Sequence, residues 1–117
     1  KKKIRTSLFI NPTLKDILYS KRVNANCVEI HTGKISNLIK KKKNYSNELK
    51  KIKKCVKFAN SLGLEVHAGH GMDYKTTEVL SKISDIKEYN IGHFIIGEAV
   101  SFGLKNVIKK INNFIKK

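Results

Sequence analysis

The sequence predicts an α/β protein built from parallel strands. Short apolar or β-branched runs alternate with amphipathic helical patterns along the 117 residues, which is typical of parallel strands joined by right-handed crossovers. No long linker or change of composition divides the chain, so we expect residues 1–117 to belong to one domain. Four strand–helix units fit either a small open sheet or half of an eight-unit barrel, which takes about 250 residues.

The first third of the chain predicts two strands with a helix between them. Residues 4–10 are apolar and partly β-branched, and they predict the first strand. Asn11 and Pro12 follow it, a pair suited to the cap and first turn of a helix whose apolar face lies within 14–18. Residues 27–31 then predict the second strand.

The lysine-rich middle of the chain predicts a loop followed by the clearest helix. Residues 34–43 indicate a loop with room for a short helical turn. From about Asn44, apolar residues recur at helical spacing while the lysines fall mostly on the other side. That apolar stripe consists of Tyr45, Leu49, Ile52, Val56 and Ala59. Gly63 is the expected stop of this helix.

The last part of the chain repeats the alternation. Residues 64–68 predict a third strand, and Asp73 is placed to cap the helix after it. The apolar stripe of that helix consists of Val79, Leu80, Ile83 and Ile86. Residues 88–91 predict a fourth strand, 94–100 fit either a continuing strand or a short helix, and a final helix covers 104–115.

Composition excludes several classes of protein. Lys and Arg number 25 against 9 acidic residues, a net charge of +16, but only two of the 25 are arginine and tryptophan is absent. Specific readers of nucleic acid use Arg and aromatic side chains. We therefore expect solvated lysine faces whose field attracts anions, phosphorylated metabolites as well as nucleic acid, and we favour the metabolites as partners. No apolar run is long enough to span a membrane, and the apolar stretch near Lys1 is too short for a signal peptide. We therefore expect a cytoplasmic protein without a membrane partner. Cys27 and Cys55 lack zinc-site spacing and are expected to be reduced, so we predict no metal.

Polar chemistry gathers at the ends of all four predicted strands, where ligands bind in parallel α/β proteins. Glu29 interrupts an apolar strand, and a carboxylate there needs a partner or a function. His70 lies between two glycines that permit close approach of a ligand, and its imidazole titrates near neutral pH. His67, earlier in that strand, is expected to be a hydrogen-bonded interior residue. His31 also lies at a strand end, and Gly92-His93 opens a segment whose backbone N–H groups suit a phosphate.

Four motifs, in this order and spacing, resemble the pyridoxine 5′-phosphate synthase family, which makes vitamin B6 by the deoxyxylulose-dependent route. They are VEIHTG at 28–33, FANSLGL at 58–64, AGHG at 68–71 and YNIGH at 89–93, the last continuing into IIGEAV at 95–100. The resemblance covers nearly the whole chain. The family is a (βα)8 TIM barrel, so this chain would supply strands five to eight and their helices, as a fragment or the ordered remainder of a longer protein.

The resemblance also implies a reaction and the residues for it. Amino-acetone 3-phosphate (3-amino-2-oxopropyl phosphate) and 1-deoxy-D-xylulose 5-phosphate would condense to pyridoxine 5′-phosphate, phosphate and water, with no cofactor. His70 would be the acid–base group and Glu29 would assist the chemistry, while Gly71, Gly92 and His93 would hold phosphate. The N-terminal half would supply further active-site residues, so the fragment alone would be inactive, and the enzyme would be a homo-oligomer.

Two other functions stay open from the residues alone. A different phosphate-binding barrel enzyme would share glycine-rich strand ends, although the order and spacing of the motifs argue against it. A basic nucleic-acid-binding α/β domain would show one basic stripe, whereas these lysines follow the solvent side of each helix.

Overall fold

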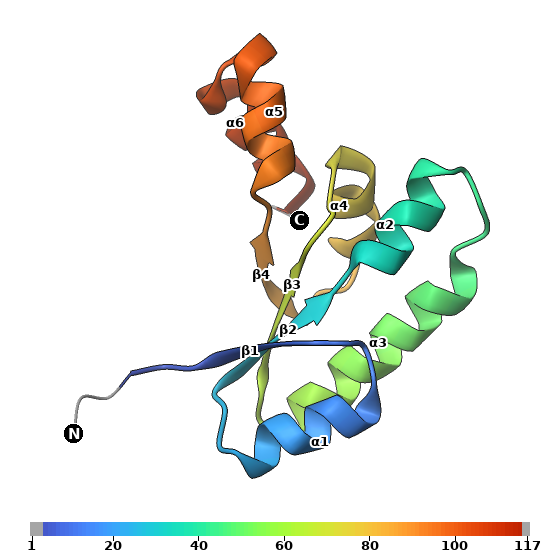
Figure 1. Ribbon diagram of the computed structural model, residues 1–117, viewed down its shortest axis with the longest axis vertical. Coiled ribbons are helices and arrows are strands. Elements are labelled where there is room, and N and C mark those ends of the chain that lie inside the picture. Colours follow the sequence, from blue (N-terminus) through green and yellow to red (C-terminus); the bar gives the residue numbers. More distant parts are fainter. Residues whose placement is uncertain (1–3, 116–117) are drawn as a thin grey trace.

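The computed structural model describes residues 4–115, and these form a four-stranded parallel sheet with six helices (Figure 1). The strands are β1 (Ser7–Ile10), β2 (Cys27–His31), β3 (Glu65–Gly69) and β4 (Ile86–Asn90). The helices are α1 (Leu14–Arg22), α2 (Gly33–Lys40), α3 (Ser46–Ser61), α4 (Tyr74–Leu80), α5 (His93–Phe102) and α6 (Leu104–Ile115). Strands lie side by side in chain order, each parallel to the next, so the expected α/β class is confirmed.

Helix α1 begins later than the sequence predicts. Thr13, and not Asn11, is its N-cap, because the Thr13 hydroxyl accepts a hydrogen bond from the Asp16 N–H at 3.1 Å. The Asn11 carbonyl instead accepts from the Thr13 N–H at 2.7 Å. This tight turn between β1 and the helix moves the cap two residues along the chain.

The stretch 34–43, predicted to be a loop with room for a short helical turn, is mostly helix, because α2 covers Gly33–Lys40. Ile35 and Ser36 are fully or almost fully buried on the inner side of α2, and the Ser36 hydroxyl donates to the Thr32 carbonyl at 2.9 Å. Lysine is a good helix former. A lysine-rich segment therefore forms a helix when a few of its small or apolar residues, here Ile35 and Ser36, pack against the rest of the protein. The loop proper begins after Lys40.

The fourth strand begins earlier than expected. Ile86, which the helical stripe had included, is the first residue of β4 and pairs with Val66 of β3. Helix α4 ends at Leu80. Its N-cap is Asp73, as predicted, and the Asp73 carboxylate accepts a hydrogen bond from the Thr76 N–H at 2.8 Å. Of the two alternatives for residues 94–100, the helix is correct, since they lie within α5.

The two faces of the sheet differ in chemistry. On one face, apolar residues of β2 and β3 pack with helix residues such as Ile17 and Ile52 in a single buried core. Those strand residues are Val28, Ile30, Val66 and Ala68. Figure 1 shows α1, α2 and α3 on this side of the sheet, with α5 and α6 beyond the carboxyl end of β4.

The opposite face is polar and lies where no helix covers it in Figure 1. Alternation along the strands places on it Ser7, Phe9, Glu29, His31, His67, Glu88 and Asn90. Phe9 is 56% exposed there. Both cysteines are free and buried, as expected. Within residues 4–115, no helix has the length and apolar character required to cross a membrane.

Candidate functional site

A cavity of about 560 Å³ opens at the carboxyl ends of β3 and β4. Four of the five predicted site residues line it. His70 and Gly71 follow β3 directly, while Gly92 and His93 form the start of α5. These pairs are separated by about twenty residues in sequence, so the parallel pairing of β3 with β4 is what joins them. The fifth predicted residue, Glu29, does not line this cavity.

Glu29 reaches the cavity through an asparagine. The Asn90 side-chain amide donates to Glu29 Oε2 at 2.8 Å, and Asn90 itself lines the cavity. Gly69 lies between them in the sheet, and a Cβ at that position would overlap Glu29 Oε1. Glycine at 69 therefore leaves the space that the carboxylate occupies. Sequence reasoning did not select Asn90, although its signal was available as a polar side chain at the end of a strand.

Two histidines stack against each other at the same end of the sheet. The His31 and His70 rings lie 4.6 Å apart between centroids with an interplanar angle of 24°, and Phe9 is 5.3 Å from His31. Gly33 makes this stack possible, because a Cβ there would lie 2.7 Å from His31 Cε1 and 3.0 Å from His70 Cδ2. The pairing of β2 with β3 thus brings His31 to His70.

The backbone of His70 is held in an unusual conformation. Its φ is +76° and that of Gly71 is +72°. Residues other than glycine rarely adopt this left-handed region. The buried Thr32 hydroxyl lies 2.8 Å from both the Gly69 and the His70 carbonyl oxygens, and its single proton is shared between these two acceptors. Neither imidazole nitrogen of His70 has a hydrogen-bond partner within residues 4–115. The ring is therefore positioned by stacking and backbone, with both nitrogens open to a ligand.

The start of α5 is suited to an anion. Gly92 is the N-cap of this ten-residue helix, without a side-chain cap and without acidic residues in the first turn. The first N–H groups of a helix have no partner within it, and their dipoles favour negative charge. A Cβ on Gly92 would meet nothing within 4 Å, so its packing does not require glycine. A cavity with these N–H groups beside an unbonded imidazole can hold an anionic group and transfer protons next to it.

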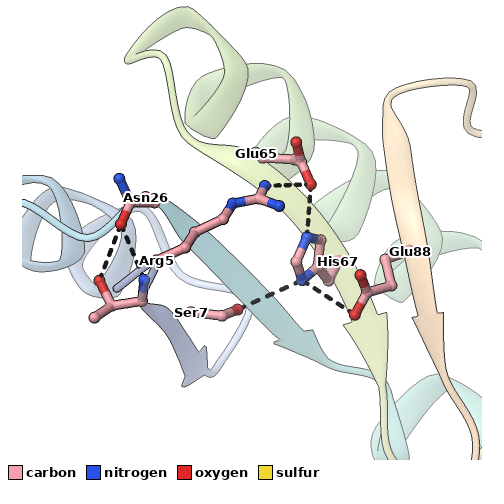
Figure 2. A network of polar contacts seen from close by, with 7 residues as sticks. Arg5, Ser7, Asn26, Glu65, His67 and Glu88 are labelled. Carbon is pink, nitrogen blue, oxygen red and sulfur yellow. Dashed lines mark hydrogen bonds and ion pairs between the residues drawn. The ribbon is translucent and has the colours of Figure 1, made fainter. Parts of the chain in front are cut away.

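A second polar cluster lies on the same sheet face, toward the amino ends of the strands (Figure 2). His67, only 4% exposed, lies 2.9 Å from Glu65 through Nε2 and 3.5 Å from the Ser7 hydroxyl through Nδ1. The Arg5 guanidinium bonds to Glu65 Oε1 at 2.5 Å. Hydrogen bonding from His67, and then from Arg5, lowers the pKa of Glu65. The prediction that His67 is a hydrogen-bonded interior histidine is confirmed.

The same cluster contains three metal-ligand types. Cys27, Glu65 and His67 offer ligand atoms within 4.8 Å of one another. Arg5 already supplies positive charge there, since its hydrogen bond to Glu65 and its proximity to Cys27 raise the pKa of the guanidinium. A fixed cation opposes the approach of a metal ion. We therefore assign the cluster to an ion-pair network.

Comparisons with known proteins agree with one another. The family described as "Pyridoxal phosphate biosynthesis protein PdxJ" matches residues 1–117. The chain is 65% identical over 116 residues to the pyridoxine 5′-phosphate synthase of Pelagibacter ubique, covering 97% of this chain and 48% of that protein. It is 45% identical over 112 residues to the synthase of the same name from a Sulfurihydrogenibium species, covering 96% of this chain and 45% of that protein. The chain spans about half the length of the curated relatives it matches.

Proposed function

This chain belongs to the family of the pyridoxal phosphate biosynthesis protein PdxJ, and from that premise we propose that the whole protein is a pyridoxine 5′-phosphate synthase. The reaction joins 3-amino-2-oxopropyl phosphate to 1-deoxy-D-xylulose 5-phosphate and yields pyridoxine 5′-phosphate, inorganic phosphate and water. The observation that carries this proposal is the shared cavity of His70, Gly71, Gly92 and His93. It combines an unbonded imidazole with an anion-binding helix start, which are the two functions that a proton-transferring enzyme for phosphate esters needs.

Each residue has a distinct role in this proposal. His70 accepts and donates protons as carbon–hydrogen bonds break and water leaves, because its imidazole lines the cavity and has no ring hydrogen bond within residues 4–115. Glu29, held by Asn90 at 2.8 Å, orients an intermediate or stabilises positive charge on it. The backbone N–H groups of Gly71, Gly92 and His93 bind the phosphate of one substrate. No cofactor takes part in these steps.

We also propose that the sheet is half of a closed (βα)8 barrel in the whole protein. Three features support this: the strands are parallel and in chain order, helices cover one face only, and the outer edges of β1 and β4 carry no strand partner within residues 4–115. Barrels remove such edges, and in a barrel the polar face would become the interior. A structure of the whole protein in which β1 or β4 remains a free sheet edge would contradict this proposal.

Self-association is a further part of the proposal. Large apolar side chains of α5 are exposed, with Ile96 at 64%, Val100 at 86% and Phe102 at 60%. Exposed apolar patches of this kind mark protein–protein contacts. Light scattering on the whole protein should therefore give a multiple of the mass of one chain.

The activity is tested directly with the whole protein. Purified enzyme is incubated with both phosphorylated substrates, and pyridoxine 5′-phosphate is followed by mass spectrometry together with released inorganic phosphate. We expect the two products in equal amounts, and neither when one substrate is left out. Phosphate release without pyridoxine 5′-phosphate would instead indicate a different phosphate-handling enzyme and would overturn the proposal.

A further inference from the structure

We propose that Lys40 is the charged anchor for a phosphate group in the cavity lined by His70, Gly71, Gly92 and His93. The inference rests on the function proposed above and adds to it a side chain that supplies full positive charge. Neither the motifs nor the sequence patterns select Lys40, which the sequence places in a run of four lysines with no visible difference among them.

Helix α2 carries Lys40 to the cavity. Lys40 is its last residue and lies one turn after Ser36, so both share the helix face toward Gly71. A Cβ built on Gly71 would lie 3.6 Å from the Ser36 Cβ, which shows how closely this face approaches. The Lys40 ammonium donates to the Gly71 carbonyl at 3.0 Å and lines the cavity.

Lys40 supplies a full positive charge to a cavity that otherwise has little. Among the described residues, Lys40 is the only Lys or Arg that lines it, and Glu98 contributes a carboxylate. A helix start supplies only about half a positive charge, whereas a phosphate ester carries close to two negative charges at neutral pH. Within residues 4–115, no other Lys or Arg lining the cavity would offset the phosphate and Glu98 if Lys40 were removed.

The neighbouring lysines Lys34, Lys41 and Lys43 do not line this cavity. Lys34 forms an ion pair with the buried Glu48 at 2.9 Å. Lys41 and Lys43 line a different cavity, of about 420 Å³, which His70 also lines. The contact of Lys40 leaves it available, because an ammonium has three donors and the Gly71 carbonyl uses one. Lys40 can therefore bind phosphate while it still holds the loop after β3.

Calorimetric titration of the whole protein with inorganic phosphate tests this role. We expect Lys40→Met to weaken phosphate binding roughly tenfold to a hundredfold, the usual range for a lost hydrogen bond to a charged group. Lys57→Met is the matched control: it removes the same charge from an exposed position of α3 and should leave the affinity unchanged. Thermal denaturation of both variants checks that each is folded.

A second variant separates charge from structure. Lys40→Gln keeps an N–H donor for the Gly71 carbonyl but has no charge, so we expect it to bind phosphate as weakly as Lys40→Met. Wild-type affinity in Lys40→Gln, or in a folded Lys40→Met, would overturn the role of Lys40 and leave the proposed synthase intact. If the wild-type protein itself binds no phosphate, the phosphate site of the proposed function fails, and the anchor fails with it.

Discussion

Two histidines of one segment, three residues apart, lie in opposite environments. His67 is buried within β3, and both of its ring nitrogens lie near polar partners, Glu65 on one side and Ser7 on the other. His70, just past the carboxyl end of β3, is exposed; its ring stacks on His31 and has no hydrogen-bond partner in the described part of the chain. The imidazole of His67 therefore stabilises the fold, whereas that of His70 is available to contact a ligand in the cavity.

The comparison shows that partners, rather than residue type, separate a structural histidine from a reactive one. An imidazole whose nitrogens are both engaged cannot take a proton from a substrate without breaking bonds in the fold. One that is held by stacking and by its backbone keeps its nitrogens available. The backbone of His70 is held by Thr32, whose hydroxyl proton is shared between the Gly69 and His70 carbonyl oxygens.

Replacing His70 should produce the largest effect. His70→Asn keeps a polar side chain but removes the imidazole that accepts and donates a proton, so kcat of the whole enzyme should fall by about 10²–10⁴-fold, as for loss of general acid–base catalysis. Phosphate affinity should be nearly unchanged. Steady-state kinetics measures the first and calorimetry the second. Turnover close to that of the wild type would return His70 to the role of a loop residue.

Blocking the helix start should affect binding more than folding. In Gly92→Leu the added side chain has space, because nothing lies within 4 Å of a Cβ at this position, yet it crowds the N–H groups at the start of α5. Affinity for phosphate should drop about tenfold, the equivalent of one or two lost hydrogen bonds. Circular dichroism should give an unchanged melting temperature. Unaltered affinity would show that the phosphate binds elsewhere.

The matching change at the other histidine should reverse this pattern. His67→Asn breaks the contacts to Glu65 and Ser7 in a buried position, which should lower the free energy of unfolding by about 1–3 kcal/mol. The kcat of the folded protein should stay as in the wild type. Denaturant titration and kinetics on the same preparation separate the two quantities. A loss of kcat without a loss of stability would place His67 in the chemistry and remove the contrast with His70.

Acid should weaken the His67 network, with the smallest effect of the four. The pKa of Glu65 is lowered by its bonds to His67 and Arg5, so its contribution to stability is complete above the ordinary glutamate pKa of about 4.3 and is lost as pH falls through the lower value. The Glu65 side chain is 39% exposed, and solvent weakens such pairs. The difference in melting temperature between wild type and Glu65→Gln should therefore shrink from pH 6 to pH 3. A constant difference would show that the carboxylate charge does not matter.

Periodicity alone determined the plan of the fold. The four strands follow one another in the expected order with helices between them, although α2 is a helix that the predicted alternation lacked. The boundaries of β2 at Cys27–His31 agree with the prediction. The polar strand ends followed as well, since parallel strands direct their carboxyl ends to one edge. Glu29, His70, Gly71, Gly92 and His93 could all be selected from local sequence, because each departs from the apolar pattern or brings glycine to a strand end.

Tertiary structure decided what each of these residues touches. Helix α2 exists because Ile35 and Ser36 are buried, and whether a surface is available to cover them cannot be read from lysine-rich sequence. Three contacts of the site each join residues at least 31 positions apart in the sequence. They are the stack of His31 on His70, the hydrogen bond from Asn90 to Glu29 and the hydrogen bond from Lys40 to Gly71. Sequence periodicity reports which face a residue takes on its own element. Only the packing of elements against one another decides which two faces meet.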